Sequence, residues 1–160
     1  MANLPKELMD ALNEPETVKV LTTIGEDGNP HSVFKHSLIA LDDETLAYIE
    51  LIEKSETDIN MLRNKWAKKL ISMAVFNQKS NVAYQIKGEA LRLILQGPIW
   101  DQFLEKTWSM LPEADPVGVW TIKVVDVLNE DYGVRRKEVT GRFKPELYSR
   151  WARYTTRKRA

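Results

Sequence analysis

Three segments rich in β-branched and aromatic residues follow one another closely in the first third of the chain. The segments are residues 18–24, 31–41 and 45–50. Gly25, Gly28 and Pro30 lie in the first connection, a composition typical of a tight turn. A parallel crossover needs a dozen or more residues, and neither connection is that long. The chain is therefore predicted to begin with an antiparallel meander.

The meander runs into a helix whose first turn carries hydroxyl and amide groups. Ser55 is suited to cap this helix, and Asp58 is suited to complete a capping box. The free N–H groups and the dipole at such an end favour a phosphate, to which Lys54, Thr57 and Asn60 add donors. The alternative is an ordinary capped helix with solvated polar groups, which is what the capping motif alone favours.

The rest of the chain continues the β pattern with one more helix. Further strands are predicted at 70–76, 82–94 and 117–128, with Gly88 marking a bulge or a bend. A helix is predicted from Gly97-Pro98, since proline suits the first turn. Its apolar stripe, which indicates core packing rather than ring stacking, consists of Trp100, Phe103, Leu104, Trp108 and Leu111. The sequence thus predicts a mainly β fold of about six strands with peripheral helices.

The order of these elements over residues 4–131 resembles the pyridoxamine 5′-phosphate oxidase-like FMN-binding split barrels. The resemblance implies an antiparallel split β-barrel that forms a homodimer, with the flavin at the interface. It places the phosphate at the turn into the helix and the ring system along the second and third strands. The cofactor-binding residues it implies are Val33, Phe34, Lys35, Glu50, Leu51, Lys54, Ser55, Thr57, Asn60, Gln85 and Trp120.

Several of these residues have a second interpretation. Lys35 either stabilises the negative charge of a reduced flavin or is a solvated strand lysine, and Trp120 either lies near the flavin or fills the barrel. Glu56 departs from the family, because many relatives carry a basic residue there and a glutamate beside a phosphate lowers affinity. The family also includes binders of deazaflavin and of haem, which remain alternatives to FMN.

Histidine and cysteine usage restricts the chemistry. The chain has no cysteine, which excludes disulfides, thiolate metal sites and a cysteine nucleophile and favours a cytoplasmic location. His31 and His36 are five residues apart, so on one strand they point to opposite faces and do not share a metal. Each is interpreted as a polar strand residue near the barrel rim. The alternatives are that His36 faces the flavin ring or a substrate, or that one of the two is a haem ligand as in haem-degrading relatives of the fold. The sequence shows no secretory signal and no apolar run of the roughly 20 residues that span a membrane.

The net charge of zero conceals a division between residues 1–134, the predicted split-barrel domain, and residues 135–160, a basic extension. The extension holds ten Lys or Arg against two Glu, a balance of +8, which leaves −8 for the rest. A helix is predicted from Pro145, with an apolar stripe beside its arginines. We expect it to dock on the acidic barrel or on the partner subunit, in preference to a nucleic acid or an anionic ligand.

The 14 residues from Gly141 to Tyr154 contain no histidine, whereas true pyridoxamine phosphate oxidases grip their substrate with an arginine and a histidine in this region. The resemblance therefore predicts a flavin-dependent oxidoreductase or flavin carrier, with substrate and nicotinamide donor unassigned. No catalytic residue is identified. The competing hypothesis is a non-catalytic binding module of the same fold.

Overall fold

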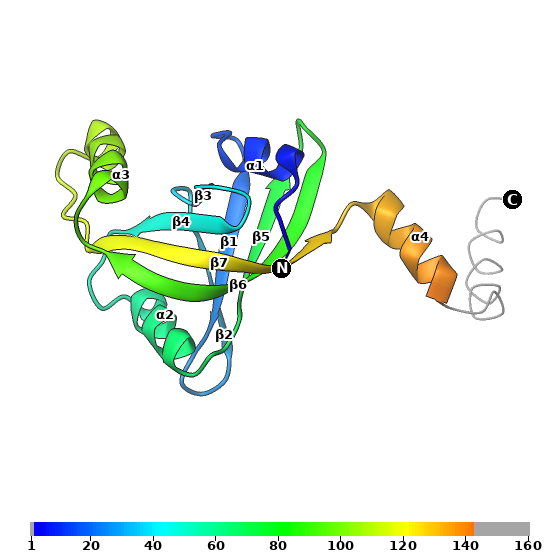
Figure 1. Ribbon diagram of the computed structural model, residues 1–160, viewed down its shortest axis with the longest axis horizontal. Coiled ribbons are helices and arrows are strands. Elements are labelled where there is room, and N and C mark those ends of the chain that lie inside the picture. Colours follow the sequence, from blue (N-terminus) through cyan, green and yellow to red (C-terminus); the bar gives the residue numbers. More distant parts are fainter. Residues whose placement is uncertain (1, 143–160) are drawn as a thin grey trace, which may run out of the picture. The chain divides into compact units, whose positions relative to one another are not determined.

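The computed structural model describes residues 2–142, without the side chains of 140–142, and is shown in Figure 1. The chain divides into two compact units, Met1–Leu128 and Asn129–Ala160. The helix predicted from Pro145 lies outside the described residues. No helix in the described part is long and apolar enough to cross a membrane.

Seven strands form one sheet in the order β2-β1-β5-β6-β7-β4-β3, with antiparallel neighbours. The sheet curls into a half-barrel (Figure 1). This confirms the predicted mainly β, antiparallel split barrel. The elements are α1 (Lys6–Leu12), β1 (Val18–Ile24), β2 (Pro30–Phe34), β3 (Ile39–Ala40), β4 (Thr45–Glu50), α2 (Glu56–Trp66), β5 (Ile71–Asn77), β6 (Val82–Ile94), α3 (Pro98–Met110), β7 (Gly118–Asn129) and α4 (Tyr132–Arg142).

The long strand predicted over residues 31–41 is wrong. The chain turns after β2, where the N–H of Leu38 donates to the carbonyl of Lys35 (3.0 Å), and the short β3 follows. Leu38 is fully buried, so the turn carries an apolar side chain into the core. Burial of Leu38 offsets the loss of strand pairing, and the break raises the number of strands to seven.

Two faces of the sheet are covered by different helices. Side chains on the concave face, including those of Leu21 and Trp120, form one core with Leu8 of α1 and Met61 of α2. In Figure 1, α1 and α2 lie at opposite ends of the curled sheet. On the convex face, Phe103 of α3 packs in a second cluster.

The stripe predicted for α3 is only partly buried. Phe103 is buried and Trp100 packs against its cluster, as expected for a docked helix. Trp108 and Leu111 are about half exposed, and the Trp108 indole donates to the carbonyl of Ala114 (3.0 Å). The helix therefore buries Phe103 and Thr107 and leaves the residues from Trp108 onward exposed.

Gly88 of β6 lies close against β7. A Cβ there would be 2.5 Å from Cγ2 of Ile122 and 2.9 Å from the carbonyl oxygen of Lys123. Pairing with β5 is regular through this residue, which faces Ile71. The glycine therefore permits a close approach of two strands, and it does not form a bulge against β5.

Lys19 is a buried cation that connects two parts of the barrel. Its ammonium donates to the carbonyls of Leu12 (2.9 Å) and Leu38 (3.0 Å), at the end of α1 and in the turn after β2. Burial, with a smaller contribution from Lys106, lowers the pKa of Lys19 from 10.5 to about 8. The folded protein thus releases this proton at a lower pH than the unfolded chain.

This shift predicts a pH-dependent difference between the wild type and Lys19→Met. Between pH 8 and 10 the unfolded wild type binds the Lys19 proton and the folded state does not, so its stability gains with rising pH. Relative to the variant, the wild type should gain about 1–2 kcal/mol over this range. Urea denaturation of both proteins at several pH values measures the difference. A constant difference would contradict the proton release.

Candidate functional site

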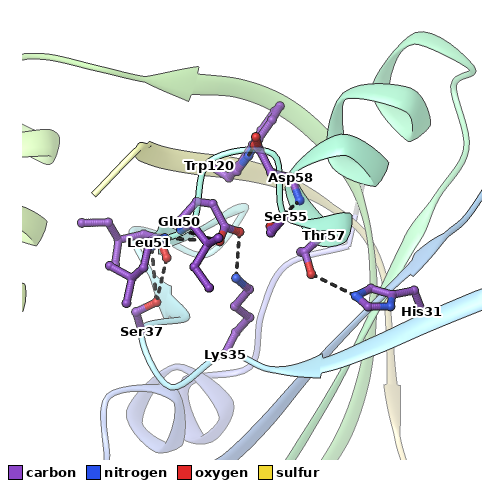
Figure 2. A network of polar contacts seen from close by, with 11 residues as sticks. His31, Lys35, Ser37, Glu50, Leu51, Ser55, Thr57, Asp58 and Trp120 are labelled. Atoms are coloured by element: carbon purple, nitrogen blue, oxygen red, sulfur yellow. Dashed lines mark hydrogen bonds and ion pairs between the residues drawn. The ribbon is translucent and has the colours of Figure 1, made fainter. Parts of the chain in front are cut away.

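The N-terminus of α2 is capped as predicted, but its capping box is not formed. The Ser55 hydroxyl accepts a hydrogen bond from the N–H of Asp58 (3.1 Å), as the cap requires. The N–H of Ser55 donates instead to the carbonyl of Ile52 (3.2 Å). The Asp58 carboxylate accepts from the indole of Trp120 (3.0 Å), as Figure 2 shows. Asp58 therefore attaches α2 to β7.

Two asparagines attach the same helix to β1. The Asn64 amide pairs with both the N–H and the carbonyl of Ile24, at 2.8 and 2.7 Å. The Asn60 amide donates to the hydroxyl of Thr23 (3.3 Å) and accepts from Arg63 (3.0 Å). Both asparagines are buried. Asn60, expected as a phosphate donor, is thus directed toward the barrel and Arg63.

A histidine from β2 contacts the first turn of α2 (Figure 2). The Nε2 atom of His31 lies 3.2 Å from the Thr57 hydroxyl, and its Nδ1 lies 3.4 Å from the Glu56 carboxylate. Thr57 is buried, whereas Glu56 is exposed. His36 lies beyond the end of β2 and is exposed. The described residues contain no group of three or more side chains suited to hold a metal.

Lys35 and the buried Glu50 form a largely desolvated ion pair with a distance of 2.8 Å from Nζ to Oε2. The other carboxylate oxygen of Glu50 accepts from the N–H groups of Leu51 (3.2 Å) and Ile52 (3.4 Å). The Lys35 side chain is only 14% exposed, so the alternative of a solvated lysine is wrong. The pair fixes the chain at the start of the connection from β4 to α2.

Tyr48 lies beside this pair inside the barrel. The Lys35 ammonium is 4.7 Å from the centre of the Tyr48 ring, a cation–π arrangement. Within the described structure the buried hydroxyl has no hydrogen-bond partner. Burial and the charges of Glu50 and Asp58 raise the pKa of Tyr48 well above 10, so it stays protonated. Trp120, its neighbour in the β4–β7 register, is 1% exposed and fills the barrel.

The remaining predicted site residues occupy different surroundings. Phe34 is 68% exposed on the convex face of β2, and Val33 packs against the core. Leu51 is exposed in the connection to α2. Lys54 is exposed with a φ of 57° and has no hydrogen bond or ion pair to another described residue. Gln85, on the convex side of β6, donates to the hydroxyl of Ser72 (3.4 Å).

An open depression of about 610 Å³ adjoins the first turns of α2. Its lining consists of Gly25, Glu26, Asp27, Lys54, Glu56, Ile59, Asn60 and Arg63. Arg63 is paired with Glu26 at 3.0 Å, which leaves Lys54 as the unpaired cation of this lining.

The groups around this turn fit a phosphate monoester. The first N–H groups of a helix have no intrahelical partner, and here they are accompanied by the Lys54 ammonium and the hydroxyls of Ser55 and Thr57. The Glu56 carboxylate opposes an anion. The structure thus brings together Lys54, Ser55 and Thr57 and adds His31, which sequence reasoning placed only at the rim. No local pattern signals this contact, because His31 and Thr57 are 26 residues apart.

Comparison with known proteins shows the fold. HupZ of Group A Streptococcus is 22% identical, with a TM-score of 0.66 over 81% of this chain and 95% of that one. A pyridoxamine 5′-phosphate oxidase-like protein of Lactobacillus delbrueckii is 23% identical, with a TM-score of 0.60 over 79% and 93%. An FMN-binding protein of Syntrophomonas wolfei is 13% identical, with a TM-score of 0.62 over 78% and 84%.

No family model matches the sequence, and no curated protein does. The structural matches establish that the chain has the split-barrel fold of pyridoxamine 5′-phosphate oxidase-like and FMN-binding proteins. They confirm the resemblance expected from the order of the elements.

The ion pair of Lys35 and Glu50 predicts strong coupling in a double-mutant cycle. Either Lys35→Met or Glu50→Gln alone should lower the free energy of unfolding by about 2–4 kcal/mol, since each leaves a buried charge unpaired. The double variant should be more stable than the sum of the two losses predicts, with a coupling of about 1–3 kcal/mol.

Urea denaturation at one protein concentration measures this cycle. The exposed pair of Lys6 and Asp10, at 3.3 Å, is the matched control and should show much weaker coupling. Equal coupling in the two pairs would contradict the assigned role of burial.

Proposed function

We propose that the chain binds FMN, with the phosphate at the N-terminus of α2. The observation that carries this proposal is the split-barrel fold, shared with an FMN-binding protein, in which the first turn of α2 adjoins an open depression. Lys54 supplies the unpaired cation of its lining. Ser55 and Thr57 do not line the depression, but they place two hydroxyls at the adjoining N-terminus of α2. These donors match the oxygen atoms of a phosphate monoester.

The ring system lies, in this proposal, along main-chain groups of Val33, Phe34 and Lys35 and of Glu50 and Leu51. When bound, FMN supplies redox chemistry, and the protein supplies binding and orientation. Glu50 holds the N–H groups of Leu51 and Ile52, so this edge is ordered before the cofactor arrives. Glu50 also neutralises the charge of Lys35. Lys35 therefore stabilises the negative charge of a reduced flavin less than an unpaired lysine would.

As activity we propose a flavin-dependent oxidoreductase or flavin carrier of unassigned substrate, acting in the cytoplasm. The second candidate is a non-catalytic module, which is consistent with the depression being lined by Glu26, Asp27 and Glu56. Three carboxylates beside the phosphate position weaken binding of an anion. Binding of FMN itself therefore distinguishes the two candidates.

A visible spectrum of the purified protein tests the proposal. After incubation with FMN and gel filtration, the protein should retain flavin absorbance that bleaches when a nicotinamide donor or dithionite is added. Retention without bleaching by a nicotinamide donor supports a carrier. Protein that stays colourless and does not quench FMN fluorescence would overturn the proposal, and retention of a deazaflavin or haem in its place would identify the alternative cofactors.

Alanine variants locate the phosphate. Ser55→Ala and Thr57→Ala should each raise the dissociation constant for FMN about tenfold and change the free energy of unfolding by only about 1 kcal/mol. Ser109→Ala, which removes an exposed hydroxyl on α3, is the matched control. If a variant loses no more free energy of FMN binding than free energy of unfolding, the result would favour a plain helix cap.

We also propose a homodimer, supported by an apolar patch on the convex face of β2, β1 and β5. Val20 is paired with Phe34, and Val18 is paired with Phe76. Phe34, Phe76 and Val18 are 68%, 50% and 41% exposed. Neighbouring exposed apolar side chains of this kind mark an association surface.

Sedimentation velocity at micromolar concentration should therefore show a dimer. Phe34→Asp should weaken the dimer at least tenfold, because a buried aromatic anchor is replaced by a charge. Met110→Asp, at an equally exposed position on α3, is the control and should leave the dimer intact. A monomeric wild type, or equal effects of both variants, would contradict this surface.

A further inference from the structure

His31 is connected to the proposed phosphate site through two contacts with different proton requirements. Its Nδ1 lies 3.4 Å from the carboxylate of Glu56, and its Nε2 lies 3.2 Å from the hydroxyl of Thr57. A carboxylate only accepts hydrogen bonds, so we assign the proton of the neutral ring to Nδ1, which faces Glu56. In the neutral ring Nε2 then has a free lone pair and accepts from Thr57. The Thr57 hydroxyl proton is thereby directed at His31.

Protonation of His31 reverses this arrangement. With protons on both nitrogens, Nε2 becomes a donor to the Thr57 oxygen, and the Thr57 hydroxyl proton is released for another acceptor. A positive charge also appears at the first turn of α2. Without it, Lys54 is the one cation of the lining that has no ion pair. Both changes favour an anion, and histidine is the side chain whose charge changes near neutral pH.

We propose that His31 tunes the affinity of this turn for the FMN phosphate, binding it more tightly when protonated. This inference rests on the proposed function. In this proposal the Thr57 hydroxyl donates a hydrogen bond to a phosphate oxygen, and the Glu56 carboxylate faces Nδ1 of the protonated ring. Considered by itself, the Glu56 carboxylate repels an anion. Through its contact with His31 it instead contributes to the binding of one.

Several other charged groups on the surrounding elements have partners of their own. On β1, the Lys19 ammonium donates to two carbonyls. At the end of β2, Lys35 is paired with Glu50 of β4. On α2, Asp58 accepts from Trp120 of β7, and Arg63 is paired with Glu26 of the β1–β2 turn. Glu56 is the charged group in contact with His31 among the described residues, and Lys54 and Asp27 line the same depression as Glu56.

Equilibrium binding of FMN and of riboflavin between pH 5.5 and 8 tests this proposal. The full-length wild type is compared with His31→Gln, with Glu56→Gln, and with His36→Gln as the matched control at an exposed histidine. The phosphate of FMN itself titrates near pH 6, but it does so equally in every variant. The ratio of wild-type to variant affinity therefore isolates the histidine, and riboflavin lacks the phosphate.

At pH 8 the wild type and His31→Gln should bind FMN about equally. At pH 5.5 the wild type should bind about tenfold more tightly, the size of one charge-assisted hydrogen bond. The corresponding ratio for riboflavin should stay near one at both pH values. Glu56→Gln should make this advantage smaller, because Nδ1 of His31 then faces a neutral amide in place of the carboxylate.

Each other outcome overturns the proposal. A wild type that binds neither ligand refutes both the proposed function and this inference. FMN binding with a ratio that is independent of pH, or a change at His36→Gln equal to that at His31→Gln, refutes the inference and leaves the proposed function standing. A riboflavin ratio that follows the FMN ratio shows that His31 acts on the ring system or on folding, which refutes its role at the phosphate.

Discussion

The polar attachment of α2 to the barrel is the contact on which the candidate site depends. Asp58, Asn60 and Asn64 are buried on the side of the helix that faces β7 and β1, whereas Ile59, Leu62 and Trp66 are exposed. Apolar packing tolerates small shifts of a helix, but a buried amide that is moved from its partner loses a hydrogen bond and stays desolvated. These bonds therefore fix the position of the first turn of α2, where Thr57 meets His31 of β2.

Two lysines with little exposure each join separate segments of the barrel. Lys19 fastens the turn after β2 to the end of α1, and Lys35 together with Glu50 fastens the beginning of the connection to α2. In each case the ammonium is satisfied by carbonyl or carboxylate oxygens, as a buried charge requires. The segments that would contact a flavin ring are thus held before a ligand binds, which reduces the entropy lost on binding.

Local sequence predicted the strands and the Ser55 cap because their causes are local: alternation of apolar residues, turn composition and the reach of one hydroxyl. It did not predict the break after β2, since the fully buried Leu38 is favoured only by the completed core. Nor did it predict the true partner of Asp58, which is Trp120, 62 residues away. A capping box and a bond to a distant indole require the same residue type, so only the folded chain distinguishes them. A separation of 26 residues likewise concealed the contact of His31 with Thr57.

Glu56 shows how the folded structure changes the meaning of a residue. By its charge alone it opposes a phosphate at the first turn of α2. Its carboxylate nevertheless lies 3.4 Å from Nδ1 of His31. With His31 neutral, Lys54 and Glu56 together contribute no net charge to the turn, and with His31 protonated the same three side chains contribute +1. The attraction of this turn for an anion is therefore a property of the three side chains acting together, and it depends on the proton that His31 holds.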